Sequence, residues 1–431
     1  MTSKRVLIVA PHFPPADTVD MHRVRMTVGH YRACGWEPVV LCARAEDTGR
    51  LLDSSLVETV PGDVRIVTVR APQSTMSRAL KINALGLRAG KAFERAGARL
   101  LSAEPFDLVF ISTTSFPLMR LGAVWKARFG VPFVLDFQDP WATYPESGKA
   151  FFRRGLRHAA MRAVHRFLEA RSVPASSGLM AVSQDYLDLL EKTYPAIGGH
   201  PVLVSPFGYS NADFQIAERV GKVAPALIAA RRHAGPVCLF AGRVAPSMER
   251  TLAALFSVVA NARASGRSAL GDMRFVFIGT GYADGASERL ASRLAQEAGI
   301  EDQVTESPDR ISLLDAWKTT LASDVLLVMG SDDAGYAPSK LNALLSLPKP
   351  LICAGPQGGA VVRQTEGFET VLTVAAGAPL DVAALADRLQ ALLASEGDYT
   401  DRVVRTAPYE AKVCAARDCE LFDRVLAAEA A

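Results

Sequence analysis

The chain of 431 residues lacks the features that mark membrane-spanning, secreted and nucleic-acid-binding proteins. No apolar run reaches the 18 residues that a membrane span needs. The first residues lead directly into a short strand-like run, which is too brief for the core of a signal peptide. A net charge of +3 is too small to make nucleic acid the expected ligand. These absences predict a cytoplasmic protein.

The six cysteines form no C-x-x-C pair and no metal-binding spacing. Cys42, Cys238 and Cys353 lie in apolar strand-like runs, which predicts buried thiols in a reducing compartment. No cluster of His, Asp or Glu has ligand spacing either, so we expect neither a metal nor a cofactor.

Short apolar runs alternate with helical stretches along the whole chain. In the first half these runs are Arg5–Ala10, Pro38–Cys42, Val64–Val69, Asp107–Ile111, Pro132–Phe137, Gly178–Val182 and Pro201–Val204, with a helix expected from about Val19 to Ala33. In the second half they are Pro236–Ala241, Met273–Ile278, Val304–Glu306, Asp324–Met329, Pro350–Ala354 and Thr370–Val374. A repeated βα order predicts parallel sheets.

The order restarts near residue 235, so the chain is expected to be α/β with two tandem Rossmann-like, doubly wound domains. We place the first at 1–206 and the second at 207–408, with a hinge near Pro206-Phe207-Gly208. The helical tail, 409–431, either ends the second domain or crosses back to complete the first.

The segment Gly335–Leu341, which follows the run Asp324–Met329, has the composition of an anion site. Pro338 suits the first position of a helix, where its missing N–H costs nothing. Ser339, Lys340 and Leu341 would then offer backbone N–H groups and one positive charge to a phosphate. An ordinary capped helix with a solvated lysine is the alternative.

Six segments appear in the order of a known pattern. They are Phe13–Pro15 with Arg23, Phe133–Trp141 (like "D-x-R-D-P-W"), Gly178–Ser183, Phe240–Val244 ("G-R-[LV]"), Phe277–Gly281 ("F-x-G-x-G") and Pro338–Leu341 ("P-S-K-[LI]"). Together they resemble the GT-B glycosyltransferases, specifically the retaining glycosyltransferase family 4, in the variant common in bacterial polysaccharide biosynthesis. The resemblance implies two domains facing a central cleft.

The resemblance implies a sugar donor with a nucleotide diphosphate, held by the second domain as co-substrate. Arg243 and Lys340 would stabilise the departing diphosphate without a metal. The other donor-binding candidates are Gly242, Arg250, Gly279, Gly281, Tyr336, Pro338, Ser339 and Leu341. Gly279 and Gly281 equally suit a tight turn.

In the first domain the resemblance implies an acceptor site, with a glycan, a lipid-linked molecule or a small molecule as acceptor. The candidates are His12, Pro14, Arg23 and Asp139, of which Asp139 would position the acceptor hydroxyl. Asp139 equally suits a turn before Pro140. Trp141 suits packing better than a sugar platform.

Several positions depart from the family pattern. Asp20-Met21 replace the usual glycine pair, Gln138 replaces arginine, and Ala343 replaces a glutamate that binds the nucleotide ribose. Asp332, Asp333 and Asn342 are the nearest polar alternatives. Three other readings therefore stay open: a weakly active partner or scaffold of another glycosyltransferase, a sugar-nucleotide epimerase, and an inverting transferase with a base in the first domain.

The segment 149–171 is basic and amphipathic, with seven Lys or Arg and one acid. Phe152, Leu156, Ala159, Ala163 and Phe167 recur at helical spacing. Such a helix either lies on an anionic membrane or packs this stripe into the core.

Overall fold

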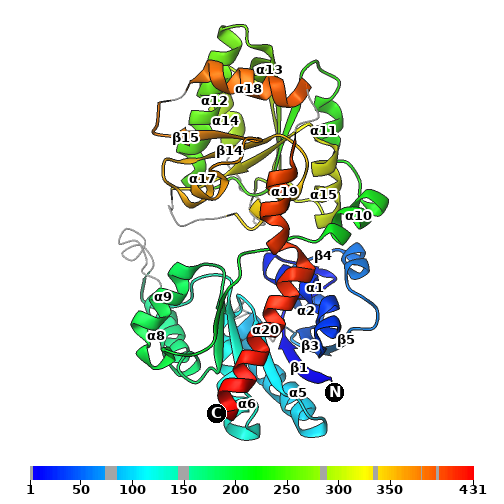
Figure 1. Cartoon of the computed structure of the whole chain (residues 1–431), viewed down its shortest axis with the longest axis vertical. Helices are drawn as coiled ribbons and strands as arrows, with labels where there is room; N and C mark the ends of the chain where they lie inside the picture. Colours follow the sequence, from blue (N-terminus) through cyan, green and yellow to red (C-terminus); the bar gives the residue numbers. More distant parts are fainter. Residues whose placement is uncertain are drawn as a thin grey trace. The chain divides into compact units, whose positions relative to one another are not determined.

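The computed structural model describes residues 3–72, 85–143, 155–281, 289–332, 338–379, 381–394 and 398–431. The chain divides into two compact units, Met1–Gly208 with Ala411–Ala431 (unit 1) and Tyr209–Glu410 (unit 2). The final helix thus belongs to unit 1, although it follows unit 2 in the chain (Figure 1). Each unit is an α/β domain built on one parallel sheet.

The sheet of unit 1 has seven strands in the order β5-β3-β1-β6-β7-β8-β9. Its strands are β1 (Lys4–Val9), β3 (Trp36–Ala43), β5 (Arg65–Val69), β6 (Leu108–Ser112), β7 (Phe133–Phe137), β8 (Gly178–Ala181) and β9 (Val202–Val204), all parallel. A small antiparallel pair, β2 (Ala16–Asp17) and β4 (Leu51–Leu52), follows the first loop. The chain builds outward from β1 on one side and resumes at β6 on its other side, so β1 and β6 flank the switch point of the doubly wound sheet.

Helices cover both faces of this sheet (Figure 1). They are α1 (His22–Thr27), α2 (Ala45–Thr48), α4 (Leu85–Arg88), α5 (Gly90–Ala103), α6 (Arg120–Phe129), α8 (Gly155–Ser172), α9 (Gln184–Thr193) and α20 (Ala411–Ala430), with 3₁₀ turns η1 (Val19–Met21), η2 (Val28–Cys34), η3 (Ser54–Thr59), η4 (Phe116–Met119) and η5 (Pro195–Ile197). The face with α5, α6 and α9 buries Phe93, Leu121 and Leu187, and the opposite face holds η2 and α20.

Phe422 anchors α20 in the core of unit 1. Its ring lies 5.8 Å from that of Tyr31, 5.3 Å from that of Trp36 and 5.2 Å from that of Phe110. Aromatic pairs at such distances stabilise beyond the burial of their area. The last helix is therefore part of the fold of unit 1.

The helix expected over 19–33 is divided. A regular α-helix spans only His22–Thr27, with the 3₁₀ segments η1 and η2 on either side. The Thr27 hydroxyl donates to the Arg23 carbonyl at 3.0 Å, a back-bond that bends helices. At Gly29 a Cβ would lie 2.7 Å from Pro61, so the chain approaches its neighbour too closely for a side chain.

The sheet of unit 2 has six parallel strands in the order β12-β11-β10-β13-β14-β15. They are β10 (Val237–Ala241), β11 (Arg274–Ile278), β12 (Val304–Ser307), β13 (Val325–Met329), β14 (Leu351–Pro356) and β15 (Val371–Ala376). The apolar runs predicted as strands in both halves of the sequence are strands here, because strands buried on both faces read as continuous apolar segments. The switch point of this sheet lies between β10 and β13.

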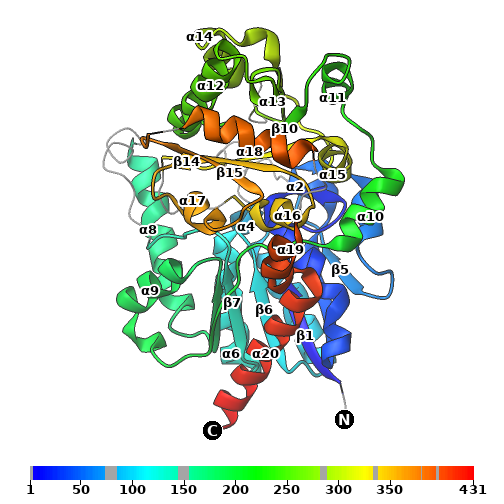
Figure 2. The same cartoon turned by 45° about the horizontal axis from the view of Figure 1, so that its top comes forward.

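The helices of unit 2 also form two layers (Figure 2). They are α10 (Asn211–Val220), α11 (Pro225–Ala230), α12 (Glu249–Ala264), α13 (Ser268–Gly271), α14 (Leu290–Glu297), α15 (Leu313–Ala322), α16 (Leu341–Ser346), α17 (Ala360–Thr365), α18 (Val382–Ala394) and α19 (Thr400–Thr406), with 3₁₀ turns η6 (Pro246–Met248), η7 (Glu301–Gln303) and η8 (Ala407–Tyr409). One layer has α12, α14 and α18, where Leu252, Leu255, Phe256 and Val259 of α12 form the buried stripe. The other has α10, α15, α16 and α17.

Candidate functional sites

At the switch point of unit 2, Gly242 and Lys340 are neighbours although 98 residues separate them in the sequence. Gly242 follows β10, and Lys340 precedes α16 on the chain that leaves β13. A Cβ at Gly242 would lie only 2.7 Å from Lys340 Nζ. Any larger residue at 242 would displace the ammonium group, so this glycine makes room for the cation.

Lys340 is only partly exposed, and its Nζ lies 5.9 Å from the centroid of the Phe240 ring. Burial, with a smaller effect from the charge of Arg310, lowers the pKa of Lys340 to about 8. Both causes disfavour the ammonium form when no anion is present. An anion placed beside Nζ would relieve both.

The loops that follow β10, β11 and β12 are joined by backbone hydrogen bonds. Gly242 N–H donates to Ile278 O at 2.8 Å, and Gly279 N–H donates to Ser307 O at 2.9 Å. Gly281 N–H donates to Pro308 O at 3.1 Å. Gly279 has φ 71°, a conformation that favours glycine, so the turn reading of this residue holds.

Arginines flank these loops. Arg243 is exposed directly after Gly242, and Arg310 is exposed after β12. The sequence interpretation missed Arg310, although its position just beyond a parallel strand is a usable signal. Arg250 is 74% exposed, and its guanidinium lies 3.9 Å from the Asp332 carboxylate.

Two expectations about the start of α16 are wrong. Pro338 is not the first residue of the helix, which begins at Leu341 with Lys340 as its N-cap. The Leu341 N–H donates to Pro338 O at 3.0 Å, so this turn uses a group that was expected to face a ligand. Ser339 lies in the same turn. Tyr336 and Asp333 lie outside the described residues.

Ala343 was expected to lie where a ribose-binding glutamate stands in the related family. Its side chain is 2% exposed, within the apolar cluster that contains Leu326, Leu344 and Leu345. A carboxylate on this Cβ would start inside the core, where an unpaired charge is costly. Position 343 of α16 therefore faces the core and not a ligand, which contradicts the expectation that Ala343 stands in the place of the ribose-binding glutamate.

At the switch point of unit 1, His12 and Asp20 form a buried hydrogen-bonded pair. His12 follows β1, and its Nδ1 lies 2.9 Å from Asp20 Oδ2. The Thr114 hydroxyl, which follows β6, donates to the same oxygen at 3.0 Å. Burial opposes ionisation of Asp20, but the hydrogen bond from His12, its charge and the hydroxyls of Thr18 and Thr114 lower the pKa of Asp20 to about 2.

Arg23 lies inside unit 1. Its Nε is 2.9 Å from Asp136 Oδ2, and its other nitrogens donate to Ser205 Oγ at 2.7 Å and to Ser205 O at 2.6 Å. Burial raises the pKa of Asp136, and the Arg23 charge partly opposes this effect. Because these protein groups engage its guanidinium, Arg23 is suited to hold the strand ends together, and the expected acceptor contact would have to compete with them.

Gln138 connects the two clusters. Its Nε2 donates to Asp20 O at 3.1 Å and to Ser112 Oγ at 2.8 Å, and Ser112 in turn donates to Asp136 Oδ2 at 2.7 Å. The residues that follow β1, β6 and β7 are thus joined in one buried polar network. Within this network Gln138 Oε1 and Asp136 Oδ1 are buried without a hydrogen-bond partner among the described residues, so it holds the strand ends together but is not fully satisfied.

The remaining candidates surround this network. The Asp139 side chain is accessible to solvent. Its pKa is nevertheless raised, first by the protein that surrounds its carboxyl group and second by the charge of Asp20. Pro14 is half-buried and is joined to Pro15 by a cis peptide bond. Trp141 stacks on Phe116 at 5.5 Å and donates to His165, so packing accounts for it.

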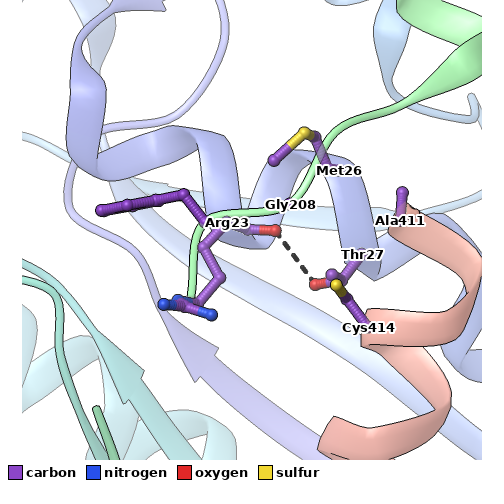
Figure 3. Close-up of a pocket in the computed structure, with 7 residues that line it drawn as sticks. Arg23, Met26, Thr27, Gly208, Ala411 and Cys414 are labelled. Carbon is purple, nitrogen blue, oxygen red and sulfur yellow. Dashed lines mark hydrogen bonds between the residues drawn. The ribbon is translucent and has the colours of Figure 1, made fainter. Parts of the chain in front are cut away.

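A small crevice lies beside Arg23 and is also lined by Met26, Thr27, Gly208 and Cys414 (Figure 3). Its volume of about 10 Å³ holds roughly one water molecule. A substrate does not fit there.

The exposed face of α8 carries apolar side chains. Phe167 is 56% and Val164 44% exposed, and the Arg171 guanidinium lies 4.4 Å from the Phe167 ring centroid. Ala159 and Ala163 are exposed too, so a core-packed stripe is wrong for these members. The only acid of the segment, Glu169, is buried, where it accepts from Thr143 at 2.6 Å. Phe152 and the Leu156 side chain lie outside what the structure describes.

Within the described ranges, no three His, Cys, Asp or Glu side chains gather as metal ligands would. None of the helices described there has the length and hydropathy of a membrane span. Cys42, Cys238 and Cys353 are buried in their strands, as the sequence predicted.

Comparison with known proteins agrees with this architecture. Residues 22–208 match the family model described as "Glycosyl transferase 4-like domain". Sucrose-phosphate synthase from Thermosynechococcus elongatus superposes with a TM-score of 0.60 at 14% identity, over 99% of this chain and 100% of that chain. The chain has the GT-B fold, and its residues 22–208 resemble a glycosyl transferase 4-like domain.

Two further structures show how widely this fold is used. Anabaena HepE in complex with UDP aligns with a TM-score of 0.57 at 12% identity, over 97% of this chain and 98% of that chain. A Listeria monocytogenes protein assigned as a UDP-N-acetylglucosamine 2-epimerase aligns with a TM-score of 0.54 at 11% identity, over 96% and 94%. A search of curated protein sequences found no match. At these identities the likeness shows the fold, and the chemistry of the two switch points must indicate the reaction.

Proposed function

We propose that the protein is a glycosyltransferase that moves a sugar from a nucleotide-diphosphate sugar to an acceptor hydroxyl. Unit 2 binds the donor and unit 1 the acceptor. The observation that carries this proposal is the Lys340 ammonium beside Gly242, at the switch point of unit 2. The UDP in the structure of Anabaena HepE supports the same class of donor.

In this proposal the diphosphate leaving group is stabilised by fixed positive charge. Burial lowers the pKa of Lys340, so a phosphate bound beside its Nζ would stabilise the ammonium form. Arg243 offers a planar fork of donors to phosphate oxygens, and Arg250 is a further candidate from α12. Fixed cations at a developing charge supply the stabilisation that a metal would otherwise give, so transfer proceeds without a metal.

We further propose transfer with retention at the anomeric carbon, which the family resemblance implies. The acceptor is a glycan, a lipid-linked molecule or a small molecule. The exposed apolar and basic face of α8 supports a peripheral contact with anionic membrane, which would favour a lipid-linked acceptor.

The test is to titrate the protein with a panel of nucleotide sugars and to follow release of nucleoside diphosphate with and without simple hydroxyl acceptors. The expected result is binding of at least one donor, acceptor-stimulated release, and full activity in the presence of a chelator. Conversion of the donor into its epimer without any acceptor, found either as nucleotide sugar or as free sugar, would instead identify an epimerase. Absence of nucleotide binding would leave a scaffold role, and NMR of the first-formed product separates retention from inversion.

A further inference from the structure

We propose that His12 Nε2 accepts a hydrogen bond from the acceptor hydroxyl, and that Asp20 is the positioning residue which fixes His12 for this role. The inference rests on the proposed function. It specifies which atom of His12 meets the acceptor, which ring nitrogen carries the proton, and which residue holds the ring. It starts from a buried pair at the switch point of unit 1.

The geometry determines which nitrogen of His12 carries the proton. Nδ1 lies 3.0 Å from Asp20 Oδ1 and 2.9 Å from Oδ2. Asp20 is ionised at neutral pH, since the contacts that it receives lower its pKa to about 2. A carboxylate only accepts hydrogen bonds, so Nδ1 must be the donor. In the neutral ring this leaves Nε2 as the nitrogen with a free lone pair.

The pair is held rigidly. Asp20 receives a side-chain hydrogen bond from Thr114 at 3.0 Å, and its backbone carbonyl accepts from Gln138 at 3.1 Å. Asp20 is 6% and His12 4% exposed. The imidazole therefore cannot turn without losing its bond to a carboxylate that is itself held in place.

The position also fits a hydroxyl ligand. His12 lies three residues beyond β1, one of the two strands that flank the switch point, where doubly wound sheets hold their ligands. No described residue makes a hydrogen bond with Nε2. A sugar hydroxyl both donates and accepts, and a neutral imidazole nitrogen is a good partner for its proton. Asp20 stands where the related family has glycine, so this device belongs to this chain.

The first readout needs no enzymatic activity. Imidazole ¹⁵N NMR of the full-length protein is expected to show His12 with the proton on Nδ1 and an unprotonated Nε2. In the Asp20→Asn variant the Nε2–H form should become populated, because the amide can donate to Nδ1. A native His12 with its proton on Nε2 overturns the proposal.

The second readout is kinetic. His12→Asn keeps a donor for Asp20 near the place of Nδ1 but removes Nε2, so the acceptor hydroxyl loses its orientation and kcat/KM for the acceptor should fall by about 100-fold. Asp20→Asn should lower it by about 10- to 100-fold. Nucleotide binding by unit 2 should remain native in both. His200→Asn, the same change at a half-buried histidine before β9, is the matched control.

The outcomes separate the two proposals. Native acceptor kinetics in a folded His12→Asn variant overturn the role of His12 and leave the glycosyltransferase intact. A native protein that binds no nucleotide sugar overturns the proposed function and, with it, the assignment of His12. If Asp20→Asn does not fold, His12→Asn still decides.

Discussion

Gln138 Nε2 donates a hydrogen bond to the backbone carbonyl of Asp20 at 3.1 Å, so two positions at which unit 1 departs from the pattern of glycosyltransferase family 4 are in direct contact. In the sequence each looked like the loss of a functional residue. In the structure they stabilise one another and hold His12. Because the two changes are physically coupled, they are better explained as an alternative arrangement of the acceptor loop than as decay of a site.

Replacing Lys340 or Arg243 by Ala should weaken binding of nucleoside diphosphates by about 1.5–3 kcal/mol, the usual size of a hydrogen bond between charged groups. Titration calorimetry with a nucleoside diphosphate and with pyrophosphate measures the loss. Arg293→Ala is the control, since it removes the same charge from a surface pair with Glu249 at 2.8 Å. Native affinity in both site variants would show that the diphosphate binds elsewhere.

Binding of the diphosphate should also depend on pH through Lys340. Burial and Arg310 hold the pKa of Lys340 at about 8 in the free protein, and a bound anion must raise it. The affinity should therefore be steady below pH 7.5 and weaken above pH 8, by up to about tenfold per pH unit. The variant Lys340→Arg stays charged and should lose this dependence. A native protein with constant affinity from pH 7 to 9.5 would contradict the assignment.

The strands, and the positions of Lys340 and His12 beyond their carboxyl ends, could be predicted, whereas side-chain partners could not. Runs such as Val325–Met329 are buried on both faces, so their continuous apolar sequence indicates a strand. Lys340 and His12 come after such runs in the sequence. The engagement of Arg23 by Asp136, 113 residues away, leaves no local pattern. The sequence also does not show which side of a short helix faces the core. Ala343 was therefore expected beside the ligand, whereas its side chain is buried.

Ala343→Glu is consequently expected to destabilise unit 2 and not to tighten nucleotide binding. The new carboxyl would enter the apolar cluster around Leu344 and Leu345, at a cost of several kcal/mol unless the helix shifts. Thermal unfolding followed by circular dichroism, with Ala343→Ser as the milder control, measures the loss. A folded variant with native stability and tighter nucleotide binding would restore the original ribose hypothesis.

Protonation of Asp418 should stabilise unit 1 as the pH falls from 7.5 to 5, against an opposing contribution from His165 and His200, whose pKa values burial lowers. Burial raises the pKa of Asp418 on α20 to about 6 from its ordinary 3.8, partly opposed by Arg23 and by the Tyr31 hydroxyl, which donates at 2.9 Å. The folded state thus binds a proton that the unfolded state releases, and by pH 5, one unit below the folded pKa, this protonation adds about 1.4 kcal/mol. Burial shifts the pKa of Asp136 and Glu169 in the same direction. Denaturant titrations of Asp418→Asn should show a weaker pH dependence, and an unchanged slope would contradict this role.

The protein should bind anionic lipid vesicles at low salt through α8. Phe167 and Val164 expose apolar surface beside the basic residues Arg166 and Arg171, and the one acid of the helix is buried. Apolar insertion and attraction to anionic headgroups act together in such helices, so adding salt should weaken binding. Co-sedimentation with phosphatidylserine-containing vesicles at low salt measures it.

In that experiment the double variant Val164→Ser/Phe167→Ser should lose most of the binding while remaining folded. Val57→Ser is the matched control, because Val57 is 53% exposed on η3 of the same unit and lies outside the basic helix. Neutral vesicles separate the two forces, since they retain the apolar term and lose the electrostatic one. Equal binding by the double variant and the control would place the membrane contact on another surface. Absence of binding by the native protein at low salt would remove the lipid surface from the proposal and favour a soluble acceptor.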